Sequence, residues 1–127
     1  MIRYFLIMVV FSLASICSAQ TEVEVAEAIG KRSNWQVEVK LWDGTRCDLV
    51  SKTHVIEVDW AKAGKYYEAI GQALYYEIAY ENTFGIHKKP AVLLLITDPV
   101  KQEEYVHRTQ AVCAKHGILL ILERVDK

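Results

Sequence analysis

The sequence predicts an α/β domain with a mixed sheet flanked by helices. Three observations predict it. Short apolar runs follow one another around Asp43-Gly44 and Ser51-Lys52-Thr53, as in an antiparallel meander. A long helical pattern comes next, and the chain then closes with a strand–helix–strand alternation. Since parallel strands need crossover connections, the expected order is α-β-β-β-α-β-α-β.

Residues 1–19 have the pattern of a secretory signal peptide. Arg3 gives a positive start, and the apolar run Tyr4–Leu13 is too short to span a bilayer. Cys17-Ser18-Ala19 then offers small residues for cleavage before Gln20. We therefore expect a secreted or periplasmic protein with no stable membrane association after cleavage. The alternative is that this segment forms a strand or helix of the fold itself.

Residues 20–127 are expected to form one domain with one core. The whole chain has a formal charge of −1, and removal of Arg3 makes it one unit more negative. This charge excludes a strong nucleic-acid binder with a basic face, so any contact with DNA should be weak or local. Cys47 and Cys113 remain, either as a disulfide or as two buried thiols. Zinc and iron–sulfur sites are disfavoured because there is no CxxC.

The first helix of the mature chain should be capped by Thr21, with Glu22 and Glu24 in its first turn, and should end near Gly30. The alternating pattern then predicts three strands, and a 3.6-residue period predicts a second helix. The three strands are Trp35–Leu41, Arg46–Val50 and Val55–Asp59, and the helix is Lys62–Tyr80.

The second half alternates buried strands with a helix. Ala91–Ile96 is a continuous apolar run, typical of a strand that is buried on both faces. Asp98-Pro99 predicts an N-cap followed by proline at the first helical position, and Gly117 should end that helix. Ile118–Leu122 should be the final buried strand.

Two acidic residues lie on adjacent predicted strands. A hairpin loop of even length centred on Lys52-Thr53 places Asp48 opposite Glu57 and Arg46 opposite Asp59, all on one face. A four-residue loop suits this register better than a tight Lys-Thr turn. Two facing carboxylates repel each other unless a proton or a cation lies between them, and Mg²⁺ is often held by such a pair. The alternative is a solvent-facing pair that is neutralised by Arg46 and nearby lysines.

The helix after these strands carries a polar stripe. At 100° per residue, Lys65, Gln72 and Tyr76 fall within about 40° of one another. A lysine beside a metal can orient water or neutralise developing phosphate charge, and Gln and Tyr can supply neutral donors. The alternative is an amphipathic helix with an incidental polar stripe.

Together these residues resemble the PD-(D/E)XK, or restriction-endonuclease-like, nuclease superfamily. Gly44–Asp48 looks like its G-x-R-x-D motif, and Gln72–Tyr76 looks like the Q-x-x-x-Y of its lambda-exonuclease-type branch. The resemblance implies the family's α-β-β-β-α-β core with an additional C-terminal helix and strand. It also implies Mg- or Mn-dependent hydrolysis of DNA, with Asp48 and Glu57 as metal ligands.

One departure from the family pattern concerns the lysine. The third-strand motif is Glu57-Val58-Asp59, so an aspartate stands where the family has lysine. Some members move this lysine to the next helix, which here favours Lys65, with Lys62 as the second choice. Gln72 and Tyr76 would then support the site.

The family often adds a glutamate from the first helix. The resemblance places this metal ligand at Glu24, with Glu22 and Glu27 as competitors. Because of Asp59, the sequence also supports a second hypothesis of a different class, namely a non-catalytic binding module that keeps a degenerate nuclease fold.

Overall fold

The computed structural model describes residues 8–11 and 20–126, which form one six-stranded sheet in the order β1-β6-β5-β4-β3-β2 with three helices. The elements are β1 (Met8–Phe11), α1 (Glu22–Ser33), β2 (Gln36–Lys40), β3 (Arg46–Val50), β4 (His54–Trp60), α2 (Lys65–Phe84), β5 (Lys89–Ile96), α3 (Glu103–His116) and β6 (Leu119–Arg124).

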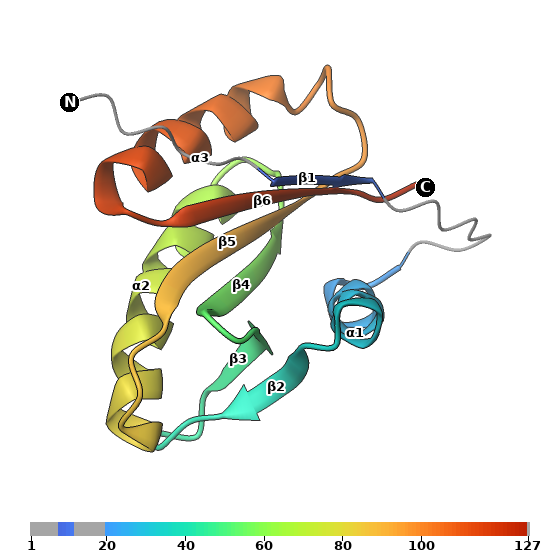
Figure 1. The fold of residues 1–127 in the computed structure, drawn as a ribbon. Coiled ribbons are helices and arrows are strands. Elements are labelled where there is room, and N and C mark those ends of the chain that lie inside the picture. Colours follow the sequence, from blue (N-terminus) through green and yellow to red (C-terminus); the bar gives the residue numbers. More distant parts are fainter. Residues whose placement is uncertain (1–7, 12–19, 127) are drawn as a thin grey trace.

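The predicted α/β class and the element order from α1 onward are confirmed. β2, β3 and β4 form an antiparallel meander, and β4, β5 and β6 are parallel, so the sheet is mixed (Figure 1). β1 adds a parallel strand at the β6 edge, with Met8 beside Ile121. Apart from Met8–Phe11, the predicted signal peptide lies outside the described residues and stays a prediction.

Helices cover both faces of the sheet. The two crossovers β4-α2-β5 and β5-α3-β6 step in the same direction across the sheet, so a common handedness places α2 and α3 on one face. Their core includes Ala73, Leu94 and Cys113. α1 covers the opposite face through Val25 and Ile29, which pack in the other core cluster.

α1 begins as predicted but ends later. Thr21 and Glu24 form a reciprocal capping box, which supports the predicted start. The helix continues past Gly30 to Ser33 and ends at Asn34, which has a left-handed conformation. Gly30 is instead required for packing, because a Cβ there would lie 2.3 Å from Cγ2 of Val37.

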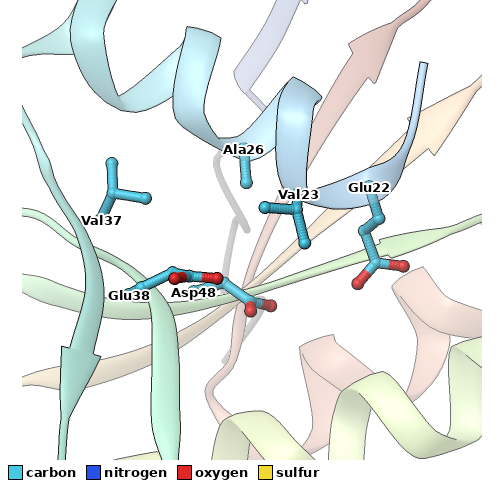
Figure 2. Close-up of a pocket in the computed structure, with 6 residues that line it drawn as sticks. All are labelled: Glu22, Val23, Ala26, Val37, Glu38 and Asp48. Carbon is cyan, nitrogen blue, oxygen red and sulfur yellow. The ribbon is translucent and has the colours of Figure 1, made fainter.

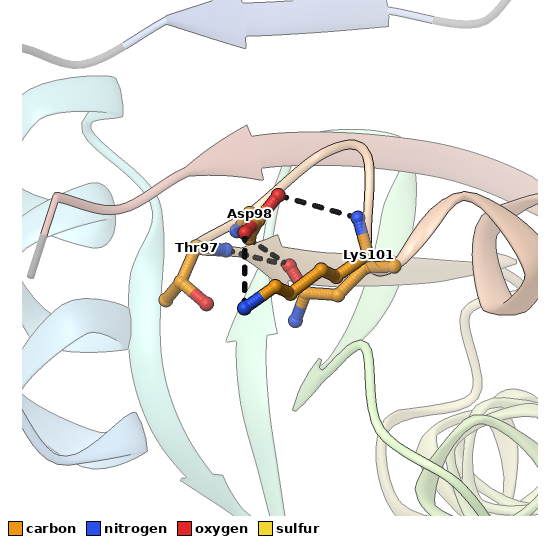
Figure 3. A network of polar contacts seen from close by, with 4 residues as sticks. Thr97, Asp98 and Lys101 are labelled. Atoms are coloured by element: carbon orange, nitrogen blue, oxygen red, sulfur yellow. Dashed lines mark hydrogen bonds and ion pairs between the residues drawn. The ribbon is translucent and has the colours of Figure 1, made fainter.

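The connection from β5 to α3 corrects a second boundary. The sequence predicts Asp98 as the helix cap, but α3 begins at Glu103. Asp98 instead caps a separate turn, in which it accepts a hydrogen bond from the Lys101 amide (Figure 3). The turn stays separate because the Gln102 side chain is used elsewhere. It accepts hydrogen bonds from the Thr97 and Asp98 amides and donates one to the Ala61 carbonyl. Gly117 ends α3 as predicted.

The described part of the chain settles the state of Cys47 and Cys113. Cys47 and Cys113 are both free and buried, so the disulfide alternative is wrong and the buried-thiol alternative holds. Among the described helices, none combines the length and apolarity that a bilayer crossing needs.

Candidate metal centre

Three acidic side chains from three different elements converge at one point. Glu22 of α1, Asp48 of β3 and Glu57 of β4 each place a carboxylate oxygen within 4.8 Å of the other two. Such spacing allows all three oxygens to reach one ion, since Ca²⁺, Mg²⁺ and Mn²⁺ bind carboxylate oxygens at about 2.0–2.6 Å. The convergence therefore has the geometry of a divalent cation site.

The β3–β4 hairpin has the predicted register. Leu49 pairs with Ile56 and Val50 with Val55, which are the partners expected from a loop centred on Lys52-Thr53. One further step in this register brings Asp48 opposite Glu57. In the described chain the ladder stops at Leu49–Ile56, and the Val58 amide donates to Oδ2 of Asp48 at 2.8 Å. The site therefore lies just beyond the point where the β3–β4 ladder ends.

β2 is irregular beside the same point. Residues two apart on a strand normally share a face, yet Val37 packs on the α1 side and Val39 on the α2 side. The residue between them, Glu38, has φ of 49°, a left-handed conformation that is unfavourable for a residue with a Cβ. The strand therefore turns over beside Asp48, the residue at the centre of the acidic cluster.

A small hollow opens on the α1 side of the cluster. Figure 2 shows Glu22, Val23 and Ala26 above it, from α1, with Val37, Glu38 and Asp48 across from them. The hollow holds about 10 Å³ of space for a water-sized body, close to what one water molecule needs. It gives small polar species access to the Glu22 and Asp48 carboxylates.

Glu57 is the most unusual side chain of the site. It is only 3 % exposed, and its Oε2 has no hydrogen-bond partner among the described residues. Burial first, and then the charges of Asp48 and Asp59, raise its pKa to about 10. Burial is also the main cause of the raised pKa of Asp48. A buried carboxylate with an unpaired oxygen is strongly disfavoured unless a proton or a cation compensates its charge.

Asp59 lies beside the cluster. It is 5 % exposed, and burial is the main cause of the raised pKa of its carboxyl. Burial, followed by the charge of Asp59, raises the pKa of Glu22 to about 7. Asp59 therefore adds a carboxylate beside the site, where a lysine would have added a positive charge.

The three residues of the predicted α2 stripe lie at different distances from the acidic cluster. Tyr76 is buried, and burial together with the Glu57 and Asp48 charges raises the pKa of its hydroxyl, which places it beside both carboxylates. Lys65 is exposed and pairs with Glu68 at 3.2 Å, while its charge lowers the pKa of Asp59 and Glu22. Gln72 is exposed on the next turns of the same helix. Tyr76 lies inside the site and Lys65 at its margin.

The predicted ligand Glu24 is not part of the cluster. Its carboxylate accepts a hydrogen bond from the Thr21 amide at 3.1 Å in the capping box, and its side chain is exposed. Two residues along a helix correspond to a rotation of about 200°, so Glu22 and Glu24 point to nearly opposite sides. Glu22 is the first-helix glutamate that the structure brings to Asp48 and Glu57.

Arg46 also departs from expectation. The predicted register places it opposite Asp59, but its guanidinium pairs with Glu38 at 3.4 Å on the exposed side of the hairpin. Glu38 is exposed, as expected of a surface residue, although it lines the hollow and contributes to raising the pKa of Asp48.

Sequence reasoning paired Asp59 with Arg46 and missed its effect on the pKa of Glu22. The sequence pattern indicated that Asp59 lies near this site, because Glu57 and Asp59 are two apart on a strand and must share a face.

No family model, curated protein or solved structure matches the chain. The link to the PD-(D/E)XK superfamily is a resemblance carried by the residues quoted above.

Proposed function

We propose that this protein is a divalent-metal-dependent nuclease that hydrolyses phosphodiester bonds of DNA. The observation that carries the proposal is the unpaired, buried Oε2 of Glu57 among the Glu22, Asp48 and Asp59 carboxylates. The described chain gives that oxygen no donor, and an all-oxygen carboxylate set fits Mg²⁺ or Mn²⁺. When bound, such an ion supplies a polarised water and charge neutralisation at the scissile phosphate.

Each residue has a role under this proposal. Asp48, Glu57 and Glu22 bind the ion. Lys65, whose charge already acts on Asp59 and Glu22, is the group that orients the attacking water or meets the phosphate. Tyr76 borders the site from α2, where burial and the charge of Glu57 raise the pKa of its hydroxyl.

The decisive experiment incubates the purified full chain with single- and double-stranded DNA in Mg²⁺, in Mn²⁺ and in EDTA. We expect cleavage that needs the metal. Asp48→Ala should lower the rate by at least about 100-fold, since even indirect partners of metal ligands are worth 10–100-fold. Asp126→Asn, an exposed aspartate far along the chain, is the matched control and should cleave as the wild type does.

Two outcomes would overturn the proposal. One is a wild-type protein with no metal-dependent cleavage of either DNA form. The other is cleavage that persists unchanged in Asp48→Ala, because a contaminating nuclease would behave in that way.

A second candidate function is a binding module that takes up the metal without hydrolysing DNA. The favouring observations are Asp59 at the lysine position and the engagement of Lys65 with Glu68. Calorimetry with Mg²⁺ and Mn²⁺ separates the two functions. Metal binding without cleavage supports the module, whereas binding with cleavage supports the nuclease.

A further inference from the structure

The large exposed apolar side chains gather around one helix. Eight such residues occur in the described part of the chain, and six of them lie on α2 or on the segments beside its C-terminal half. These six are Trp42, Tyr67, Tyr75, Ile78, Phe84 and Ile86. Concentration of apolar surface on one element is typical of an interaction site, whereas scattered single residues are ordinary.

Four residues of α2 follow one another along one side of the helix. Tyr67, Gly71, Leu74 and Ile78 have the spacing i, i+4, i+7 and i+11. Leu74 is half-buried against the core beneath α2 and α3, so the exposed part of the stripe is Tyr67, Gly71 and Ile78. Tyr67 is 60 % exposed and Ile78 58 % exposed. The opposite side of α2 packs on the sheet, as Figure 1 shows. We call this stripe together with the neighbouring Tyr75 the α2 face.

Gly71 is an unexpected residue at the centre of this face. Glycine in a helix interior weakens the helix relative to alanine. A Cβ at Gly71 would meet nothing within 4 Å, so packing inside the chain does not require glycine here. A glycine in the middle of an apolar stripe allows the backbone of a second helix to approach closely.

The two ends of α2 favour one arrangement of that second helix. At the N-terminal end, the N-cap is Gly64, so no side chain caps the first-turn amides, and Glu68 is the acidic residue of the first turn. At the C-terminal end, Glu81 continues the stripe one turn beyond Ile78, and no basic residue lies in the last turn. An antiparallel copy that sets Tyr67 beside Ile78 also sets Glu81 beside the partner's Gly64, at the positive end of its helix dipole. A parallel copy would set the two Glu81 carboxylates against each other.

We propose that the α2 face joins two copies of this chain in an antiparallel, two-fold symmetric dimer. Tyr67 of each copy packs beside Ile78 of the other, and the two Gly71 residues lie near the axis. A two-fold contact is self-complementary, which the stripe and the charges at its ends satisfy. The inference is independent of the proposed nuclease activity.

The dimer should be weak. One helix pair with its flanking side chains buries less than the roughly 800 Å² per partner of a standard stable interface. We therefore expect a dissociation constant in the micromolar range. Sedimentation velocity of the full chain over roughly 1 μM to 1 mM covers that range.

Matched variants test the assignment. Ile78→Lys should raise the dissociation constant at least tenfold while the circular dichroism spectrum stays unchanged, because Ile78 is exposed. Val100→Lys makes the same change at another exposed apolar residue, away from α2, and should leave the dimer intact. Gly71→Ala should weaken the dimer even though alanine favours the helix. A wild type that stays monomeric throughout the range, or an Ile78→Lys variant that dimerises as the wild type does, overturns the proposal.

Discussion

At the scale of single residues, the first-helix glutamates differ sharply although they are two positions apart. Glu22 lies with Asp48, Glu57 and Asp59, while Glu24 closes the capping box at the start of α1. Only the helical rotation separates the proposed metal-binding role of Glu22 from the structural role of Glu24. The two side chains therefore make a matched pair for experiment.

We expect Glu22→Gln to lower Mg²⁺ affinity by about 10–100-fold, the usual range for losing a group that supports a metal site. Glu24→Gln should leave that affinity unchanged, because its carboxylate serves the Thr21 amide. Isothermal titration calorimetry with Mg²⁺ and Mn²⁺ measures both. Equal affinities in the two variants would place the ligand elsewhere.

Two lysines, one before α2 and one at its start, compete for the role at the scissile phosphate that the proposed nuclease function requires. Lys65 acts on the Asp59 and Glu22 carboxylates, whereas Lys62 lies over the Trp60 ring at 5.8 Å. We expect Lys65→Met to reduce the rate of metal-dependent DNA cleavage by about 100–1,000-fold, the range for losing one charge-stabilising donor. Lys62→Met should change it little. The reverse order in single-turnover rates would transfer the role to Lys62.

At the scale of elements, the β2–β3 hairpin shows how a strand irregularity positions the site. The left-handed Glu38 turns β2 over between Val37 and Val39, and the β3–β4 ladder ends beside Asp48. The freed Val58 amide donates to Asp48 and holds its carboxylate in place. Irregular backbone of this kind concentrates where a strand must redirect a functional side chain.

Two glycines on different helices should respond oppositely to alanine. Gly30→Ala places a Cβ 2.3 Å from Val37 Cγ2, so we expect a loss of about 1–3 kcal/mol from overpacking. Gly71→Ala meets open space and should stabilise the monomer by about 0.5–1 kcal/mol. Urea unfolding at low protein concentration measures both. Destabilisation by Gly71→Ala would show that α2 needs glycine within the single chain.

At the scale of the whole molecule, the acidic cluster links stability to pH and to metal. The raised pKa of Glu57, about 10 against an ordinary 4.5, means that the folded protein keeps a proton that the unfolded chain releases. The contribution of Glu57 to the free energy of unfolding is fully present below about pH 4.5 and declines as the pH rises toward 10. A bound cation compensates the carboxylate, so metal should offset the loss.

We expect the free energy of unfolding in EDTA to fall from about pH 5 to about pH 9, with a shallower fall for Glu57→Gln. Some slope should remain in that variant, since the pKa values of Asp48, Asp59 and Glu22 are also raised. Glu27→Gln, an exposed change on α1, is the control. Urea titrations at each pH supply the measurement. Identical slopes in Glu57→Gln and wild type would contradict the buried, protonated state.

Mg²⁺ should stabilise the wild type most at high pH, where the proton competes least for the site. The shift in the unfolding midpoint on adding Mg²⁺ measures this effect. No shift at any pH would argue against the metal centre.

The sequence by itself determined the α/β class, the element order from α1 onward and the register of the β3–β4 hairpin, because turn chemistry and strand alternation are local. Only the tertiary structure decided that Glu22 and not Glu24 lies with Asp48 and Glu57, that Asp59 contributes to raising the pKa of Glu22, and that Arg46 pairs with Glu38. These choices depend on the angle at which α1 meets the sheet and on the irregular backbone at Glu38. Both are set by packing between segments far apart in the chain, which no local pattern records.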